Sequence, residues 1–293
     1  DIVYLNSVFS MQSVQYCVLR RIGAVPETPV VFAPRGELSP GPLALKRTKK
    51  TAYLRVARAL GLLDGITWQA SSPLEESEIR AVVGGDAVIR VVPNLSRTNS
   101  HVDVPEPPRK DPGAVRLVYL SRISPKKNLL FLLHALRYVP GSVELDLFGP
   151  IDDAAYWSEC EQVISALPAN VAVSHRGAIP HETVAPSLAA YHVMALPTLG
   201  ENFGHVILEA LRAGVPVLIS DTTPWRGLSE CRVGWDLPLD RASWGHVLSR
   251  IVQMDDVEFR SMSAAARALG RQWVERRDIV QANVDLFRKA AAL

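Results

Sequence analysis

The sequence predicts an α/β protein of two domains, each built on a parallel β-sheet. Short apolar segments alternate with amphipathic helical patterns along the whole chain, which is typical of βαβ units. At 293 residues the chain is too long for one ordinary core. A break in composition, Ser96–Ser100 followed by four prolines between 105 and 112, separates two such series. We therefore expect one domain on each side of this linker.

The elements follow from the apolar runs and the Gly and Pro residues that bound them. In the first series we expect strands at 2–5, 29–33, 67–70 and 88–92, and helices near 11–22, 41–62 and 73–83. In the second we expect strands at 116–120, 144–148, 171–174, 192–196 and 217–220, and helices near 128–138, 154–166, 181–190, 205–213, 242–254 and 257–273. An amphipathic helix at 279–292 ends the chain. The expected domains are thus 1–111, including the linker, and 112–275, with a C-terminal helix over 276–293.

The composition is that of a soluble globular protein, with 48% hydrophobic and 21% charged residues. The net charge is only +2, but residues 1–60 hold nine Lys or Arg against three acids. Three widely separated cysteines indicate neither a zinc site nor a disulfide framework, so we expect a reducing cytoplasm. No apolar run can span a bilayer, and no signal peptide is visible. Because the chain begins at Asp1, directly in a strand-like run, we expect it to be a fragment.

The most informative segment is 197–219, which follows a buried strand at 193–196. Glu201 and Glu209 stand eight residues apart around a glycine at which a helical pattern begins, and Gly214 stops that helix. A strand, a glycine loop and a helix start offer unpaired backbone N–H groups and the positive end of the helix dipole to a phosphate. A carboxylate on each side would hold hydroxyl groups, which suits the sugar and the ribose of a nucleotide sugar.

The sequence PTLGENFGHVILEALRAGVPV resembles the E-x7-E signature of retaining GT-B glycosyltransferases, in particular family four of bacterial surface-polysaccharide enzymes. The resemblance covers most of residues 114–240. It implies two Rossmann-like domains, with the C-terminal helix returning toward the first. It also implies metal-independent transfer of a hexose, with retention and no cofactor, to a surface-glycan or lipid-linked acceptor. A UDP-sugar is favoured as donor, and GDP-mannose is the alternative. The family's Gly-rich loop has no counterpart in residues 1–60, so the first domain is expected to be incomplete.

The resemblance assigns roles within this signature. Glu201 would accept hydrogen bonds from the hydroxyl groups of the donor sugar, and Glu209 would bind the ribose. The amides of Phe203 and Gly204 would hold the distal phosphate. Asn202 stands where many relatives have Gly, and an asparagine can adopt the left-handed backbone there.

A second motif follows the strand at 116–120. Arg122 and Lys127 lie five residues apart in a strand-to-helix loop and would neutralise the charge that grows on a departing diphosphate. This loop is similar to the family's G-R-x-x-x-x-K-G element, with Ser121 and Asn128 in place of the two glycines. Lys126 competes with Lys127 for the role of the lysine. A solvated basic loop is the alternative interpretation.

Three strand ends carry weaker signals. Gly149 ends the strand at 144–148, and His175 to Ile179 ends the next; in the family these positions approach the donor and its base. Glycines at strand ends also serve turns alone. In the first domain Arg35 and Gly36 follow a strand and would meet an acceptor or the donor phosphates, although a loop arginine is also often simply solvated.

The basic segment 41–60 has an apolar face and a cationic one. It is either a core-packed helix with a solvated basic side or a contact for anionic lipid or a lipid-pyrophosphate acceptor on the inner face of the membrane. The seven histidines do not pair at metal-ligand spacings, and nothing indicates nucleic-acid binding. Two other functions remain open: a non-catalytic nucleotide-sugar-binding fragment or subunit, and a GT-B-fold sugar-nucleotide epimerase.

Overall fold

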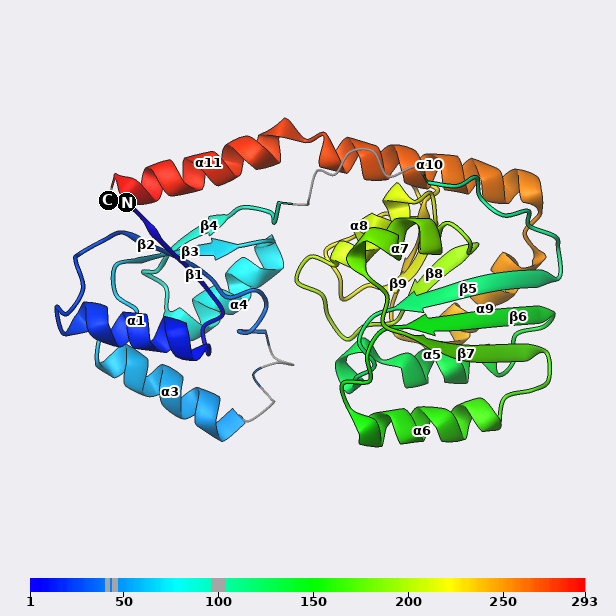
Figure 1. Ribbon diagram of the computed structural model, residues 1–293, viewed down its shortest axis with the longest axis horizontal. Helices are drawn as coiled ribbons and strands as arrows, with labels where there is room; N and C mark the ends of the chain where they lie inside the picture. Colours follow the sequence, from blue (N-terminus) through cyan, green and yellow to red (C-terminus); the bar gives the residue numbers. More distant parts are fainter. Residues whose placement is uncertain (40–42, 44–46, 96–103, 293) are drawn as a thin grey trace. The chain divides into compact units, whose positions relative to one another are not determined.

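The computed structural model describes residues 1–39, 43, 47–95 and 104–292. The expected linker residues 96–100, and residues 41, 42 and 44–46 of the basic segment, lie outside the described residues. The chain divides into two compact units (Figure 1), which are Asp1–Ser96 with Arg276–Leu293, and Arg97–Glu275.

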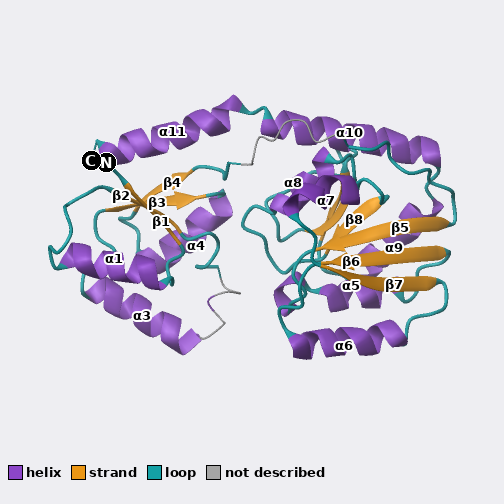
Figure 2. Cartoon of the chain, in the orientation of Figure 1, coloured by secondary structure: helices purple, strands orange, loops and turns teal. Residues whose placement is uncertain are grey.

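The first unit has a parallel sheet in the order β1-β2-β3-β4 within its described residues. Its strands are β1 (Val3–Asn6), β2 (Val30–Ala33), β3 (Ile66–Ala70) and β4 (Val88–Val91). Helices α1 (Met11–Arg21), α3 (Arg47–Ala59) and α4 (Pro73–Val83) connect successive strands. Right-handed crossovers that step across a sheet in one direction place their helices on one face (Figure 2). The core on that face includes Phe32 and Trp68, whose rings stack 5.1 Å apart.

The opposite face of this sheet is covered by the C-terminal helix α11 (Arg277–Ala291). Leu286 and Ala290 of α11 pack with Val31 and Val92, all at most 5% exposed. Asn283 donates a hydrogen bond from Nδ2 to the carbonyl oxygen of Pro93, 3.1 Å away. The last helix of the chain therefore completes the core of the first unit.

The second unit has a six-stranded sheet in which every described pairing is parallel, in the order β7-β6-β5-β8-β9-β10. The strands are β5 (Ala114–Leu120), β6 (Ser142–Phe148), β7 (Val171–Gly177), β8 (Val193–Leu196), β9 (Val217–Ser220) and β10 (Gly234–Leu237). The α-helices are α5 (Leu129–Leu136), α6 (Ala154–Ser165), α7 (His181–Leu188), α8 (His205–Arg212), α9 (Arg241–Gln253) and α10 (Asp256–Val274). A short 3₁₀ turn, η1 (Pro125–Lys127), precedes α5.

This strand order contains a topological switch point. The chain runs outward from β5 through β6 to β7, then returns to β8 on the other side of β5. The connections that leave the carboxyl ends of β5 and β8 therefore run in opposite directions along the sheet. In open α/β sheets ligands bind at this place, which makes it the first position to search for a site.

The expected strands and helices are present in the described residues, with small shifts at their ends. One strand was missed, β10. Its sequence, Gly234-Trp-Asp-Leu, has no apolar run, and its glycine is required by packing. A Cβ on Gly234 would lie 2.0 Å from the carbonyl oxygen of Val217 on the neighbouring strand. A contact of this kind between distant segments leaves no local pattern.

Candidate functional site

Hydrogen bonds join the loops that follow β5 and β8. The amide of Leu199 donates to the carbonyl oxygen of Lys126 at 2.8 Å, and the Thr198 hydroxyl donates to the same oxygen at 3.3 Å. The Ser220 hydroxyl, at the end of β9, donates to the Thr198 carbonyl oxygen at 2.5 Å. The two motifs singled out in the sequence are thus held side by side at the switch point.

Lys127 and Glu201 form an ion pair across this junction, between Nζ and Oε1. Their side chains are 13% and 12% exposed, so the pair is largely shielded from water. Asn128, next to Lys127, adopts a left-handed backbone with φ of 57°. It therefore takes the conformation for which a glycine is usually required, and this explains how Asn can replace the last Gly of the motif.

The start of α8 is shaped by Gly204, which caps the helix in a left-handed conformation with φ of 78°. A Cβ there would lie 2.7 Å from Cδ1 of Ile207. The amides that open a helix have no partner within it and point outward from its N-terminus. Asn202 does not use the left-handed backbone that an asparagine can adopt: its φ is not positive, and Gly204 supplies the turn instead. The turn at Gly204, two residues after Asn202, directs the chain into α8.

A buried aromatic cluster supports this turn. Trp225, which follows β9, donates from Nε1 to the carbonyl oxygen of Phe203 at 2.6 Å. The Phe203 ring is 5% exposed and lies 5.7 Å from the Trp225 ring, while Trp273 at the end of α10 lies 4.8 Å from Trp225. Sequence analysis missed Trp225, for which a Pro-Trp pair after a buried strand was the only signal. Its indole fixes the peptide that leads into the helix start.

Glu209 lies one turn into α8 and faces α7. Its Oε1 is 3.5 Å from Nδ1 of His181, and its side chain is 24% exposed. Burial raises the pKa of the Glu209 carboxyl, and His181 and Arg212 oppose that rise. This carboxylate is therefore partly shielded from water. A ligand hydroxyl that donates a hydrogen bond to it displaces little water and satisfies a partly desolvated oxygen.

Arg122 is exposed, with 59% of its side chain accessible, and pairs with Asp152 through Nη1 and Oδ2 at 2.9 Å. Its loop lies against the end of β6. A Cβ on Gly149 would come within 2.0 Å of the Ser121 carbonyl oxygen, and the φ of Gly149 is 137°. Gly149 is therefore required for the close approach of these two loops. Asp152 had no sequence signal, because its partner is 30 residues away.

At the end of β7, His175 contacts the Gly149 loop, with Nε2 3.0 Å from the Gly149 carbonyl oxygen. The His175 ring lies 5.0 Å from that of Trp157. Ile179 is half-buried and packs against the core of the second unit. These residues support the sheet edge, and their expected contacts with a donor stay predictions.

Arg35 and Gly36 belong to the first unit, and their polar groups are engaged there. Arg35 donates from Nε to Asn6 at 3.0 Å and from Nη2 to the Tyr4 hydroxyl at 2.5 Å, and it also donates to Asn94. The Gly36 amide donates to Oε1 of the buried Glu75 at 2.7 Å. Both residues therefore connect strand ends of their own unit, and their expected role toward an acceptor stays a prediction.

The carboxyl edge of the second sheet thus holds a set of groups suited to a diphosphate ester. A cationic loop, the amides of a helix start and two carboxylates come from the ends of β5 and β8. Across the described residues, His, Cys, Asp and Glu side chains form no group of three or more that could hold a metal ion.

Comparison with known proteins assigns this segment. Residues 114–234 match the family model described as glycosyl transferases group 1. The matched residues all lie within the second unit. The structure of HepE from Anabaena in complex with UDP and glucose has a TM-score of 0.73 and 21% identity, and the match covers 100% of this chain and 78% of HepE. The predicted fold, two Rossmann-like α/β domains as in GT-B structures, is confirmed.

Two curated relatives are mannosyltransferases. Phosphatidyl-myo-inositol mannosyltransferase of Mycobacterium leprae is 27% identical over 199 residues, which are 64% of this chain and 50% of that protein. O-antigen chain mannosyltransferase B of Escherichia coli is 29% identical over 110 residues, 36% of this chain and 28% of that protein. The chain spans half the length of the mycobacterial relative.

Proposed function

We propose that this protein is a retaining glycosyltransferase that transfers a hexose from a nucleotide sugar to a surface-glycan or lipid-linked acceptor. The observation that carries the proposal is the junction of the β5 and β8 loops. It sets the Lys127–Glu201 ion pair beside the start of α8. The match of residues 114–234 to group 1 glycosyl transferases supports the same function.

In this proposal the second unit binds the donor. The amides at Phe203 and Gly204 hold the distal phosphate, Glu209 binds the ribose, and Glu201 accepts hydrogen bonds from sugar hydroxyls. Because the Lys127 ammonium has three N–H groups and Glu201 two oxygens, their ion pair leaves capacity for a ligand on both sides. The pair positions both groups before the donor arrives, which lowers the entropy cost of binding.

The chemical step is dissociation of the bond between sugar and phosphate. Arg122 and Lys127 neutralise the charge that grows on the leaving diphosphate, together with the dipole of α8. The acceptor hydroxyl attacks the same face that the phosphate leaves, and the departing phosphate oxygen takes its proton. No protein side chain is required as a general base on this route, and no metal or cofactor is invoked.

For the donor we favour a UDP-sugar, with GDP-mannose as the alternative. HepE was crystallised with UDP-glucose, whereas the curated relatives transfer mannose. The test is the rate and stereochemistry of donor turnover, followed by proton NMR of the anomeric signal. Arg122→Ala should lower the turnover number more than donor affinity, and Glu209→Ala should do the reverse. Near-native kinetics in both variants, or a product of inverted configuration, would contradict the proposal.

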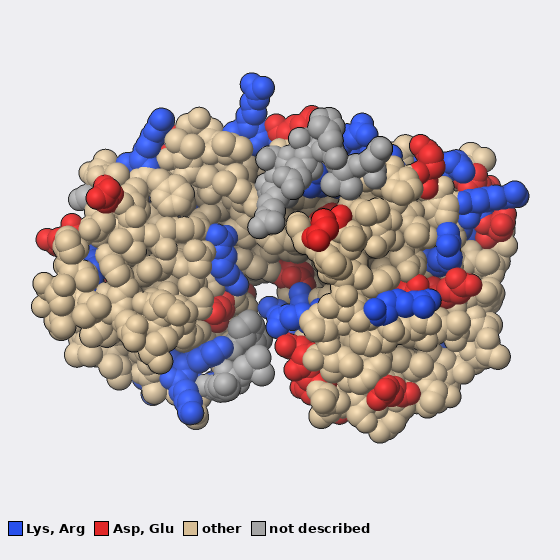
Figure 3. Space-filling view, in the orientation of Figure 1, with Lys and Arg blue, Asp and Glu red and all other residues tan. Residues whose placement is uncertain are grey.

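A peripheral contact with anionic membrane lipid is also proposed, through the cationic side of α3. This helix carries Arg47, Lys49, Lys50, Arg55 and Arg58 and no acid. On the face in view, Figure 3 shows Lys and Arg side chains in the part of the first unit where α3 lies. No helix among the described residues is long and apolar enough to cross a bilayer. If vesicles with anionic lipid do not sediment the protein at low salt, this contact does not exist.

A further inference from the structure

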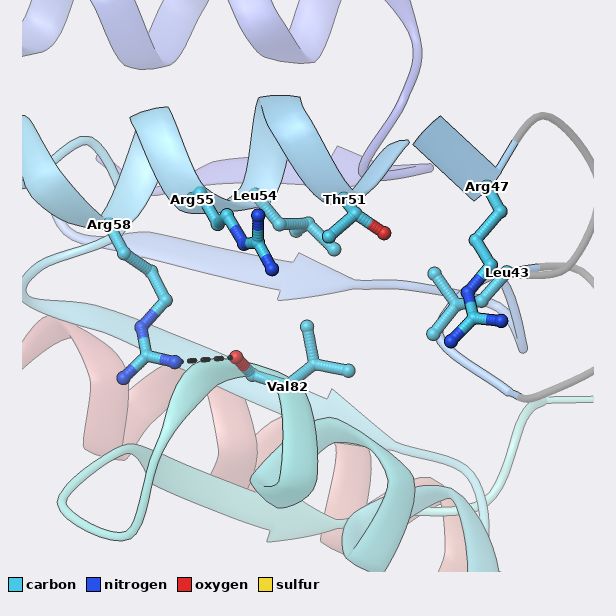
Figure 4. A pocket seen from close by; sticks show the side chains of 7 residues that line it. All are labelled: Leu43, Arg47, Thr51, Leu54, Arg55, Arg58 and Val82. Carbon is cyan, nitrogen blue, oxygen red and sulfur yellow. Dashed lines mark hydrogen bonds between the residues drawn. The ribbon is translucent and has the colours of Figure 1, made fainter. Parts of the chain in front are cut away.

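A pocket in the first unit lies between α3 and the last turn of α4 (Figure 4). It encloses about 540 Å³, which is within the usual range for small-molecule sites. Its lining residues are Leu43, Arg47, Thr51, Leu54, Arg55, Arg58 and Val82. It belongs to the first unit, whereas the donor-binding residues of the candidate site belong to the second.

The polar part of the pocket is cationic. Arg47, Arg55 and Arg58 lie on one side of α3, because spacings of eight and eleven residues return to the same helix face. Figure 4 shows the Arg55 guanidinium pointing from α3 toward α4. Arg58 donates to the Val82 carbonyl oxygen at 3.3 Å, whereas Arg47 and Arg55 have no hydrogen bond or ion pair with any described residue. No acidic side chain lines the pocket.

The remaining lining is apolar and continuous with the core. Leu54 is 8% exposed and belongs to the core cluster of the first unit, and Leu43 and Val82 pack against that cluster. Thr51 adds one hydroxyl between the arginines. A ligand in this pocket therefore meets guanidinium groups at the rim and aliphatic carbon at the floor.

We propose that this pocket binds a phosphate group carried on an apolar chain. Guanidinium groups bind phosphate oxygens through paired hydrogen bonds. The three cations that line the pocket repel one another, and a bound anion would offset that repulsion. The aliphatic floor would bury the carbon chain next to the phosphate. A lipid head group and a soluble alkyl phosphate share this chemistry. The site deepens the α3 lipid contact proposed above, and it involves none of the residues assigned to sugar transfer.

Three probes separate the parts of the ligand: hexyl phosphate, inorganic phosphate and 1-hexanol, each titrated into the protein by calorimetry at low salt. Arg55→Gln removes the central guanidinium. Lys289→Gln is the matched control, since Lys289 is an exposed cation of the same unit, on α11, and does not line the pocket. Both variants change the net charge by one unit, and neither touches the core.

The proposal predicts that hexyl phosphate binds at least tenfold more tightly than either partial probe. Arg55→Gln should weaken hexyl phosphate binding roughly tenfold, the order expected for one hydrogen bond to a charged group, and Lys289→Gln should weaken it less than twofold. An equal loss of hexyl phosphate affinity in both variants would show a diffuse charge effect and overturn the proposal. Binding of inorganic phosphate as tight as that of hexyl phosphate would also overturn it, and so would the absence of hexyl phosphate binding at millimolar concentration.

Sedimentation with phosphatidic acid vesicles then identifies the source of the phosphate. If Arg55→Gln reduces vesicle binding and Lys289→Gln does not, the pocket takes a lipid head group. If both variants bind vesicles equally while hexyl phosphate still requires Arg55, the pocket takes a soluble phosphate ester.

Discussion

Trp225→Phe should reduce nucleotide binding by releasing the peptide that opens α8. The substitution removes the indole N–H that donates to the Phe203 carbonyl oxygen at 2.6 Å, inside a cluster where both rings are nearly buried. An unsatisfied buried carbonyl costs about 1–3 kcal/mol, and the smaller ring leaves a cavity as well. We expect the free energy of unfolding to fall by about 2–4 kcal/mol in total.

The second unit offers a matched control in Trp244→Phe. Trp244 is 0% exposed and donates from Nε1 to the Pro238 carbonyl oxygen at 3.1 Å, away from the α8 start. Both variants should therefore lose similar stability in urea denaturation without ligand. Only Trp225→Phe should weaken the binding of UDP or GDP, by roughly tenfold. A displaced Phe203–Gly204 turn loses one hydrogen bond from a backbone amide to the charged phosphate.

Calorimetric titration of the preferred nucleotide into both folded variants, at a temperature well below their melting points, decides the matter. Unchanged affinity in Trp225→Phe would refute the positioning role of Trp225. A tenfold loss in Trp244→Phe as well would show that affinity follows global stability and not the local turn.

Three further predictions concern the same sheet edge. Lys127→Met leaves the nearly buried Glu201 carboxylate without its cation, and urea denaturation should show a loss of about 2–4 kcal/mol in the free energy of unfolding. The double variant Lys127→Met/Glu201→Gln should recover most of that loss, and no recovery would mean that the two side chains are not coupled. Because the pKa of Glu209 is raised by burial, its contribution to stability is full below pH 4.5 and is lost as pH rises through the folded pKa. Glu209→Gln should therefore raise the melting temperature of the free protein at pH 7 but not at pH 4, and equal effects at both would contradict this. Gly149→Ala should destabilise the protein by more than about 2 kcal/mol, because the new Cβ would overlap the Ser121 carbonyl oxygen. A native-like melting temperature would show that the Gly149 and Ser121 loops separate easily.

The order of strands and helices followed from the sequence because each depends on residues close together in the chain. The signature around Glu201 and Glu209 was visible for the same reason. The Arg122–Asp152 pair and the Trp225 hydrogen bond were not, because each joins segments that only the fold brings together.

Two details show how local rules fail when several residues compete. Asn202 can adopt a left-handed backbone, but the left-handed residue is Gly204, which has no side chain to clash in that conformation. Arg35 donates hydrogen bonds to Asn6 and Tyr4 within the first unit, which its sequence position did not indicate, and its role toward a ligand stays a prediction. Sequence position places a side chain at a strand end, and only packing determines which groups it reaches.

The central claim is that the loops after β5 and β8 bind the diphosphate and ribose of a nucleotide sugar. It is tested most directly by the melting temperature of the protein with UDP, GDP, ADP and their sugar conjugates, without added metal. A ligand that binds the folded state must raise that temperature by mass action. We predict a rise with one nucleotide family that is lost in Glu209→Ala. No rise with any nucleotide, or a rise that Glu209→Ala leaves unchanged, would contradict the assignment of this site.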